Sequence, residues 1–152
     1  MRRFGYDVAL FVALLSTAVA LGPALAHLFE LPNKISLVKA DYFTVQQIYR
    51  GWNLLAFVLL AEVVSIVAVA LYARSDRSMR IAALVALACV VGAQALFWSF
   101  TNPANVATAN WTAQPENWVE LRNQWEFSHA GGAMLQVVAM MSLIAGAISR
   151  RG

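Results

Sequence analysis

The sequence has one cysteine, two histidines and few charged residues. A lone Cys89 cannot form an intrachain disulfide or a C-x-x-C pair, which excludes the usual thiol–disulfide exchange chemistry. Charged residues make up 12% of the chain, whereas soluble domains have about 25%, so the composition argues against a soluble protein. The eleven Lys and Arg residues lie in small groups between apolar segments, without the basic stripe that binds nucleic acid.

Hydrophobic residues, in contrast, make up 61% of the sequence and are concentrated in four long segments. These segments cover residues 8–29, 52–73, 81–100 and 128–148. Each has about 20 residues, enough for an α-helix to cross about 30 Å of hydrocarbon. The pattern predicts an all-α fold: a four-helix transmembrane bundle that forms a single domain over residues 1–152. We therefore expect the protein to be embedded in a lipid bilayer.

The basic residues indicate how the bundle is oriented. One predicted side has seven of them and the other has four: Arg2, Arg3, Arg74, Arg77, Arg80, Arg150 and Arg151, against Lys34, Lys39, Arg50 and Arg122. By the positive-inside rule, the side with seven is cytoplasmic. We therefore expect a multi-pass protein of the inner (plasma) membrane with both termini in the cytoplasm. Two longer extracytoplasmic loops, 30–51 and 101–127, are expected, the second made irregular by Pro103 and Pro115.

The N-terminus supports a second interpretation. The basic start MRRFGYD, the apolar residues after it and the PALA before His27 resemble a signal peptide with an A-x-A cleavage site. Cleavage there would make His27 the new N-terminus. The apolar segment is longer than the usual core of a signal peptide, so we expect a retained membrane span.

Ionisable and polar groups recur near one end of the predicted bundle. His27 and Glu30 end the first span, and Glu126 and His129 stand three residues apart at the start of the fourth. The second pair belongs to a segment that begins at Trp118 and has no turn signal, which predicts one continuous helix. Because successive spans run in opposite directions, these groups should meet at the outer end of the bundle.

Two spans carry further polar groups on their way into the membrane. Glu62 lies in the second span, roughly 15 Å along the helix from the same end, and Gln94 lies about two turns inside the third. An ionisable side chain in a span is costly unless it is paired or faces a cavity, so Glu62 is a candidate functional residue.

The two imidazoles and two of the carboxylates form a chemically suitable ligand set for a non-haem metal: His27, Glu30, Glu126 and His129. The two histidines also suit the axial ligation of a haem. A third interpretation is metal-free, with His129 or Glu126 as a general base beside Arg122. A purely structural interpretation is an Arg122–Glu126 ion pair at i, i+4 spacing. The sequence leaves the cofactor open.

Short motifs in this chain resemble those of a known family. They are a P-x-N at Pro103–Asn105, the pattern W-x-x-L-R-x-x-W-E-x-x-H from Trp118 to His129, and a polar turn at the end of the first span. Together with four spans, these motifs resemble the anthrone-oxygenase-like family of small membrane proteins.

The resemblance implies a four-helix membrane fold and, for some family members, oxidation of anthrones to anthraquinones by molecular oxygen without a defined cofactor. It points to four residues here: Asn105, Arg122, Trp125 and His129.

We therefore expect an oxygenase or redox protein that acts on a hydrophobic aromatic or quinone-like small molecule. Its expected catalytic residues are His129, Arg122 and Glu126, the last two as oxyanion stabiliser and orienting group. Its expected pocket residues are Glu62, Gln94, Asn105 and Trp125. The alternative is a non-catalytic membrane subunit or small carrier that uses Glu62 as an intramembrane proton or cation site. Either protein could associate with itself or with another chain.

Overall fold

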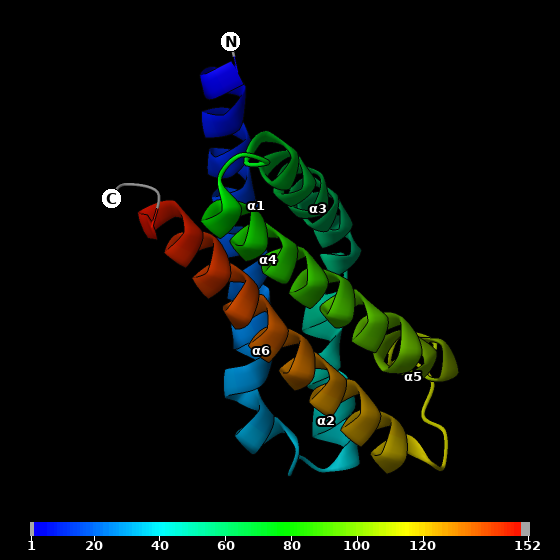
Figure 1. Cartoon of the computed structure of the whole chain (residues 1–152). Coiled ribbons are helices and arrows are strands. Elements are labelled where there is room, and N and C mark those ends of the chain that lie inside the picture. The colour runs from blue at the N-terminus through cyan, green and yellow to red at the C-terminus, as the bar shows by residue number, and fades with distance from the viewer. Residues whose placement is uncertain (1, 150–152) are drawn as a thin grey trace.

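The computed structural model describes residues 2–149, and every regular element in this range is helical (Figure 1). Four helical segments are long and apolar enough to cross a membrane: Arg3–Lys34, Trp52–Tyr72, Arg77–Ala107 and Trp118–Ser149. This confirms the predicted all-α chain with four candidate membrane spans. Arg150 and Arg151, which contributed to the predicted orientation, lie outside the described residues.

The four long helices form a closed ring. The first, α1 (Arg2–Lys34), packs against α3 (Leu55–Tyr72) and α6 (Trp118–Ser149), and α4 (Arg77–Leu96) packs against the same two helices. Neighbours in the ring run antiparallel (Figure 1). The start of α1 and the end of α6 lie at the same end as the α3–α4 turn, while the short helices α2 (Lys39–Gln46) and α5 (Asn102–Ala107) lie at the opposite end, called the loop end below.

Small residues allow the helices to approach closely away from the loop end. Ala13, Ala83, Ala86 and Ala139 are completely buried in one core cluster there. At Gly146 of α6, an added Cβ would lie only 2.7 Å from the Cβ of Ala82 and the Sδ of Met79, both on α4. Close backbone approach through small residues is the ordinary way in which helices pack in lipid.

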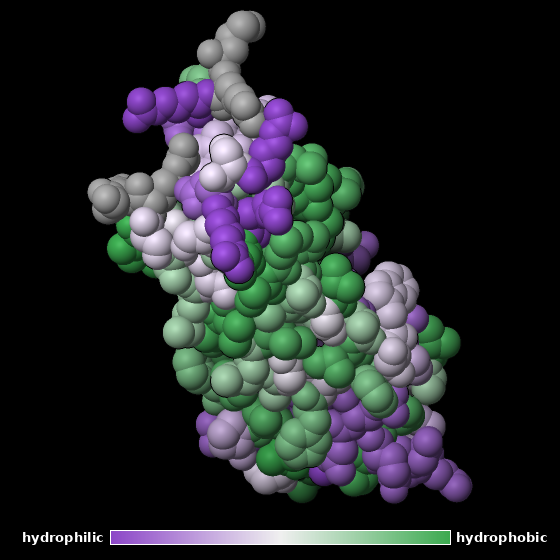
Figure 2. Space-filling model, in the orientation of Figure 1, coloured by the Kyte–Doolittle hydropathy of each residue, from purple (hydrophilic) through white to green (hydrophobic). Residues whose placement is uncertain are grey.

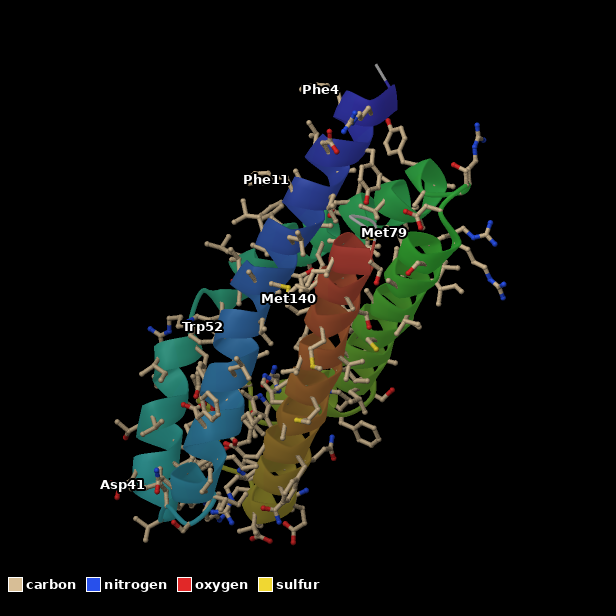
Figure 3. The ribbon with its side chains drawn as sticks, turned by 60° about the vertical axis from the view of Figure 1, so that its left-hand side comes forward. Phe4, Phe11, Asp41, Trp52, Met79 and Met140 are labelled. Atoms are coloured by element: carbon tan, nitrogen blue, oxygen red, sulfur yellow. The ribbon has the colours of Figure 1, made fainter. Side chains whose placement is uncertain are left out.

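Large apolar side chains point away from the bundle instead. Phe4 and Phe11 of α1 extend outward and are 73% and 66% exposed (Figure 3). On the face shown in Figure 2, apolar residues cover the middle of the molecule and hydrophilic residues gather at its two ends. An apolar belt between polar ends is the surface that a bilayer requires.

The first span is longer than the sequence indicates, because the chain stays helical beyond Phe29. Helix α1 continues through Pro32 to Lys34. A proline in the body of a helix removes one hydrogen bond and crowds the preceding turn. The last turn nevertheless stays helical, and Lys34 at its end is buried. This turn places Lys34 on the same helical face as His27 and Glu30.

The third span is also longer, which corrects the expectation of an irregular loop from Thr101. After α4, a π-helical segment (Phe97–Thr101) leads directly into α5, so Pro103 lies in a helix. A widened π turn suits a residue that cannot donate to the preceding turn. The fourth span is one continuous helix from Trp118, as predicted.

Candidate functional site

A cavity of about 930 Å³ lies in the loop end of the bundle. Its walls come from all four long helices, and residues Ala109 to Thr112 form part of its roof. Two of the lining residues, Ala56 at the start of α3 and Trp98 beyond α4, are also exposed on the outer surface. Other lining residues are exposed at the loop end, among them Asn53, Asn110 and Thr112, so exposed residues border the cavity both there and beside the candidate membrane spans.

The structure brings five of the predicted site residues to the cavity wall: His27, Gln94, Asn105, Trp125 and His129. Four others lie behind the wall: Glu30, Glu62, Arg122 and Glu126. The cavity is therefore lined by imidazole, amide and aromatic groups. The carboxylates of Glu30, Glu62 and Glu126 do not line it.

The two histidines are in direct contact, as the alternation of the spans predicts. The ring centroids of His27 and His129 are 4.2 Å apart in an edge-to-face arrangement. His129 also stacks on Trp125, with 4.0 Å between the ring centroids. Axial ligands of a haem bind on opposite faces of the iron, and two rings in contact leave no space for an iron between them. This geometry does not fit bis-histidine haem ligation.

A carboxylate orients the ring of His27. Its Nδ1 lies 2.9 Å from Oε1 of Glu30, one turn further along α1. An ionised carboxylate can only accept a hydrogen bond, so Nδ1 is the protonated nitrogen and Nε2 has the free lone pair of the neutral ring. A carboxylate that fixes the tautomer of a histidine is the arrangement that prepares general bases in hydrolytic enzymes.

A chain of hydroxyl groups orients His129 in the same sense. Ser128 donates to the backbone carbonyl of Trp125 at 2.9 Å, so Thr101 must donate to Ser128 across their 2.7 Å contact. Thr101 Oγ1 then accepts from Nδ1 of His129, 3.2 Å away. Thr101 lies in the π-helical segment, where the widened turn faces α6. Both imidazoles therefore have Nε2 as the basic nitrogen.

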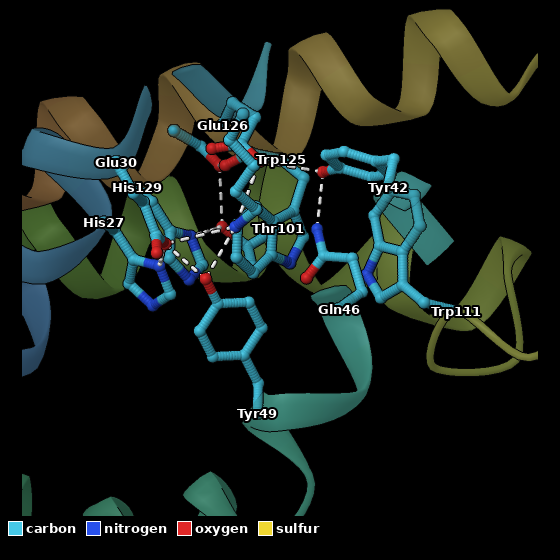
Figure 4. A network of polar contacts seen from close by, with 12 residues as sticks. His27, Glu30, Tyr42, Gln46, Tyr49, Thr101, Trp111, Trp125, Glu126 and His129 are labelled. Atoms are coloured by element: carbon cyan, nitrogen blue, oxygen red, sulfur yellow. Dashed lines mark hydrogen bonds and ion pairs between the residues drawn. The ribbon is translucent and has the colours of Figure 1, made fainter. Parts of the chain in front are cut away.

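Beside the two rings lies a network of polar groups that includes Glu30, Tyr49 and Glu126 (Figure 4). Lys34 is at its centre. The Lys34 side chain is 3% exposed, and its ammonium lies 3.1 Å from Glu30 Oε1 and 3.2 Å from Glu126 Oε1. It also donates to the hydroxyl of Tyr49 at 2.7 Å. The network thus joins α1, α6 and the segment after α2. The predicted Arg122–Glu126 interaction is replaced by the pair of Glu126 with Lys34.

Two tyrosines complete the network as donors. Tyr49 donates to Glu30 Oε1, and Tyr42 donates to Glu126 Oε1 at 2.9 Å. Burial and the neighbouring carboxylates raise the pKa of both hydroxyls well above the ordinary value. Both therefore remain protonated donors at any physiological pH. Gln46, which lines the cavity, donates in turn to the Tyr42 hydroxyl.

Arg122 occupies a different place from the one expected. Its Nη1 donates to the backbone carbonyl of Leu37 at 3.2 Å, and its guanidinium lies over the ring of Trp118. Because Arg122 does not line the cavity, the geometry gives no support to its predicted role as oxyanion stabiliser. It ties the chain between α1 and α2 to α6.

Glu62 is fully buried below the cavity. Its Oε2 accepts from Nε2 of Gln136 at 3.2 Å, while its Oε1 has no hydrogen-bond partner. Gln136 lines the cavity, so Glu62 is connected to the cavity through this amide. Glu62 of α3 therefore accepts an interhelical hydrogen bond from Gln136 of α6.

The roof of the cavity has unusual backbone geometry. Ala109, Asn110 and Trp111 have φ angles of 48°, 54° and 63°, a left-handed conformation that costs roughly 1–2 kcal/mol for each non-glycine residue. Three consecutive residues of this kind persist only where contacts hold them. The Trp111 indole and the Trp125 indole both donate to Oδ1 of Asn105 at 3.0 Å. Asn105 thereby links the roof to the tryptophan that stacks on His129.

Sequence reasoning missed the centre of the network. In the sequence, Lys34 contributes only to the predicted orientation, although its spacing from Glu30 (i, i+4) and His27 (i, i+7) would place the three on one helical face. Hydropathy ends the predicted span at Phe29, which leaves Lys34 outside the helix. Tyr42 and Tyr49 had no recognisable signal, since their partners are distant in sequence.

Within residues 2–149, no group of three or more His, Cys, Asp and Glu side chains is arranged to hold one metal ion. The chain matches no protein-family model, and no curated protein sequence or solved structure is similar to it.

Proposed function

We propose that the cavity binds a planar, hydrophobic aromatic molecule of the anthrone or quinol type and that the chain catalyses its oxidation. The observation that carries this proposal is a cavity of about 930 Å³ with two oriented imidazoles on its wall and with Ala56 and Trp98 of the candidate membrane spans in its lining. A volume of this order suits a ligand with several rings. In this proposal, a molecule dissolved in the bilayer enters beside the exposed lining residues Ala56 and Trp98.

The chemistry begins with removal of a proton by His27. Its Nε2 is the basic nitrogen because Glu30 holds Nδ1 as a donor. His129 is the second imidazole against the substrate and receives a hydrogen bond or a proton at its own Nε2. Aromatic groups around the two rings exclude water, which strengthens these interactions.

For an anthrone, the reaction balances with molecular oxygen as the oxidant. Deprotonation of the methylene carbon gives an electron-rich anion that reduces O₂. The methylene carbon loses both hydrogens and forms a C=O bond with one oxygen atom, while the other oxygen atom leaves as water. The four electrons that the carbon loses are the four that O₂ gains. The residues here bind the substrate, move its proton and stabilise the anion.

The distribution of exposed basic residues supports an outward-facing site in the inner membrane. Lys34 is buried in the network, so it no longer counts as a basic surface residue at the loop end. Arg74 in the α3–α4 turn and Arg77 and Arg80 at the start of α4 lie at the other end, which the positive-inside rule assigns to the cytoplasm.

The alternative, a membrane carrier or subunit that uses Glu62, has one observation in its favour. Glu62 is 0% exposed and retains an unpaired carboxylate oxygen, and buried ionisable groups in membrane spans commonly mark proton or ion pathways. The oriented imidazoles favour the enzyme, because a proton site at Glu62 alone would not need them.

Ligand binding can be measured through tryptophan fluorescence. Four of the five tryptophans line the cavity: Trp52, Trp98, Trp111 and Trp125. A quinone such as menadione should therefore quench most of the emission of the detergent-solubilised protein in a saturable way. Gly132 lines the cavity, and an added Cβ there meets only Ala93, at 4.0 Å. Gly132→Leu is thus expected to fill the cavity and weaken binding at least about tenfold.

The matched control is Met134→Leu, two residues further along α6 at a position that is 54% exposed. It should bind the quinone as the wild-type protein does. Equal affinity of the wild-type and Gly132→Leu proteins would show that the ligand binds elsewhere.

A further inference from the structure

Among the described residues, anionic, neutral and aromatic groups surround the buried ammonium group of Lys34. Two carboxylate oxygens, from Glu30 and Glu126, lie 3.1 and 3.2 Å away, and the Tyr49 hydroxyl lies 2.7 Å away. The ring centroids of Trp125 and Tyr49 lie 4.3 and 4.4 Å from it. This is a complete set of partners for a cation: anionic oxygens, a neutral oxygen and aromatic faces.

The same residues would surround a metal ion in a carboxylate–imidazole site. Metal ligation would draw the two carboxylate oxygens to roughly 2.0–2.2 Å from a common centre. Here the centre is occupied by an ammonium at hydrogen-bond distances, carried on a side chain that is 3% exposed. A second cation placed among these oxygens would be repelled by a charge that cannot move away.

We propose that Lys34 supplies the permanent cation of this site, in the position that a metal ion would otherwise take, and that it thereby positions Glu30 for His27. The first part stands on the contacts of Lys34 alone. The second part rests on the proposed function, in which His27 is the base. Lys34 is a positioning residue because it does not line the cavity.

The positioning acts through one atom. Oε1 of Glu30 accepts from the Lys34 ammonium, from the Tyr49 hydroxyl and from Nδ1 of His27. Two of these donors fix the oxygen, and the third is the ring that it orients. Without the ammonium, Glu30 and Glu126 would be two carboxylates facing a space that a divalent cation can enter.

Titration with Co²⁺ tests the cation position without any assay of turnover. The wild-type protein and Lys34→Arg, which keeps the charge, should show no visible absorption bands of bound Co²⁺. Lys34→Ala should bind one Co²⁺ per chain at least about 100-fold more tightly than either, and Co²⁺ should raise its melting temperature.

Three results would overturn the proposal: equimolar metal in the purified wild-type protein, wild-type Co²⁺ binding as tight as that of Lys34→Ala, or no Co²⁺ binding by folded Lys34→Ala. If Lys34→Ala does not fold, the metal content and Co²⁺ titration of the wild-type and Lys34→Arg proteins still decide the question.

The positioning role has a separate readout. In steady-state assays with an anthrone, Lys34→Arg should restore most of the kcat lost in Lys34→Ala, while KM stays similar in all three proteins. If the cobalt result holds and kcat is unchanged in Lys34→Ala, the cation assignment survives and the positioning role through His27 fails.

Discussion

Replacement of His27 by alanine is expected to lower the turnover of an anthrone or quinol by about 10²–10⁴-fold, the usual contribution of a general base. The reason is that His27 is the imidazole whose Nδ1 is held by a carboxylate, at 2.9 Å from Glu30, and whose ring lines the cavity. The measurement is kcat/KM with purified protein in detergent, followed by the absorbance of the quinone product. Added imidazole should restore part of the lost activity, because the deleted ring leaves space in the cavity.

The control for this prediction is Glu62→Gln. Glu62 does not line the cavity and contacts it only through Gln136, so its replacement should change turnover by less than the loss of either histidine. The reverse pattern, in which Glu62→Gln abolishes function and His27→Ala and His129→Ala are tolerated, would favour the carrier. His129→Ala should retain more activity than His27→Ala, because no carboxylate orients His129.

The largest expected effect on stability comes from removing Lys34. Breaking a buried ion pair by deleting one partner typically costs about 3–5 kcal/mol, because the other charge stays buried without compensation. In Lys34→Met, Glu126 would retain only Tyr42 as a donor, and its second oxygen already has no hydrogen-bond partner. Glu126→Leu should be milder, because Lys34 would still pair with Glu30 at 3.1 Å. Denaturation in mixed detergent micelles gives the difference in unfolding free energy.

The double variant Lys34→Met/Glu126→Leu separates charge from packing. It removes both ends of the pair and leaves Glu30, whose side chain is 28% exposed and can be solvated. Replacing both partners of a buried pair by apolar groups is often close to neutral. The double variant should therefore be more stable than Lys34→Met alone. If it is instead as unstable as the sum of the two single variants, the two residues do not interact in the folded protein.

The helices were predictable because hydropathy follows directly from the residues in each segment. The juxtaposition of His27 and His129 was also predictable, since four antiparallel spans can bring the end of the first and the start of the fourth to only one end of the bundle. The hydrogen-bond and ion-pair partners of the site residues were harder to predict from the sequence. The partner of Glu126 is Lys34, which is distant in sequence, and not Arg122, which is one turn away.

Two local backbone conformations could not be predicted from the residue types alone. The extension of α1 through Pro32 brings Lys34 into the network, although a proline ordinarily signals a helix end. The left-handed turn at Ala109 and Trp111 uses residues that rarely adopt positive φ. Both are stabilised by contacts with distant segments, such as the hydrogen bond from Gln47 to the carbonyl of Trp111.

The most direct test of the account is photo-crosslinking with an azidoquinone, followed by mapping of the modified peptides by mass spectrometry. The account predicts labelling of cavity residues, above all the exposed Trp98 and Trp125 beside His129, and competition by unlabelled menadione. Labelling confined to the outward-facing side chains of α1, such as Phe4 and Phe11, and unaffected by menadione would contradict it.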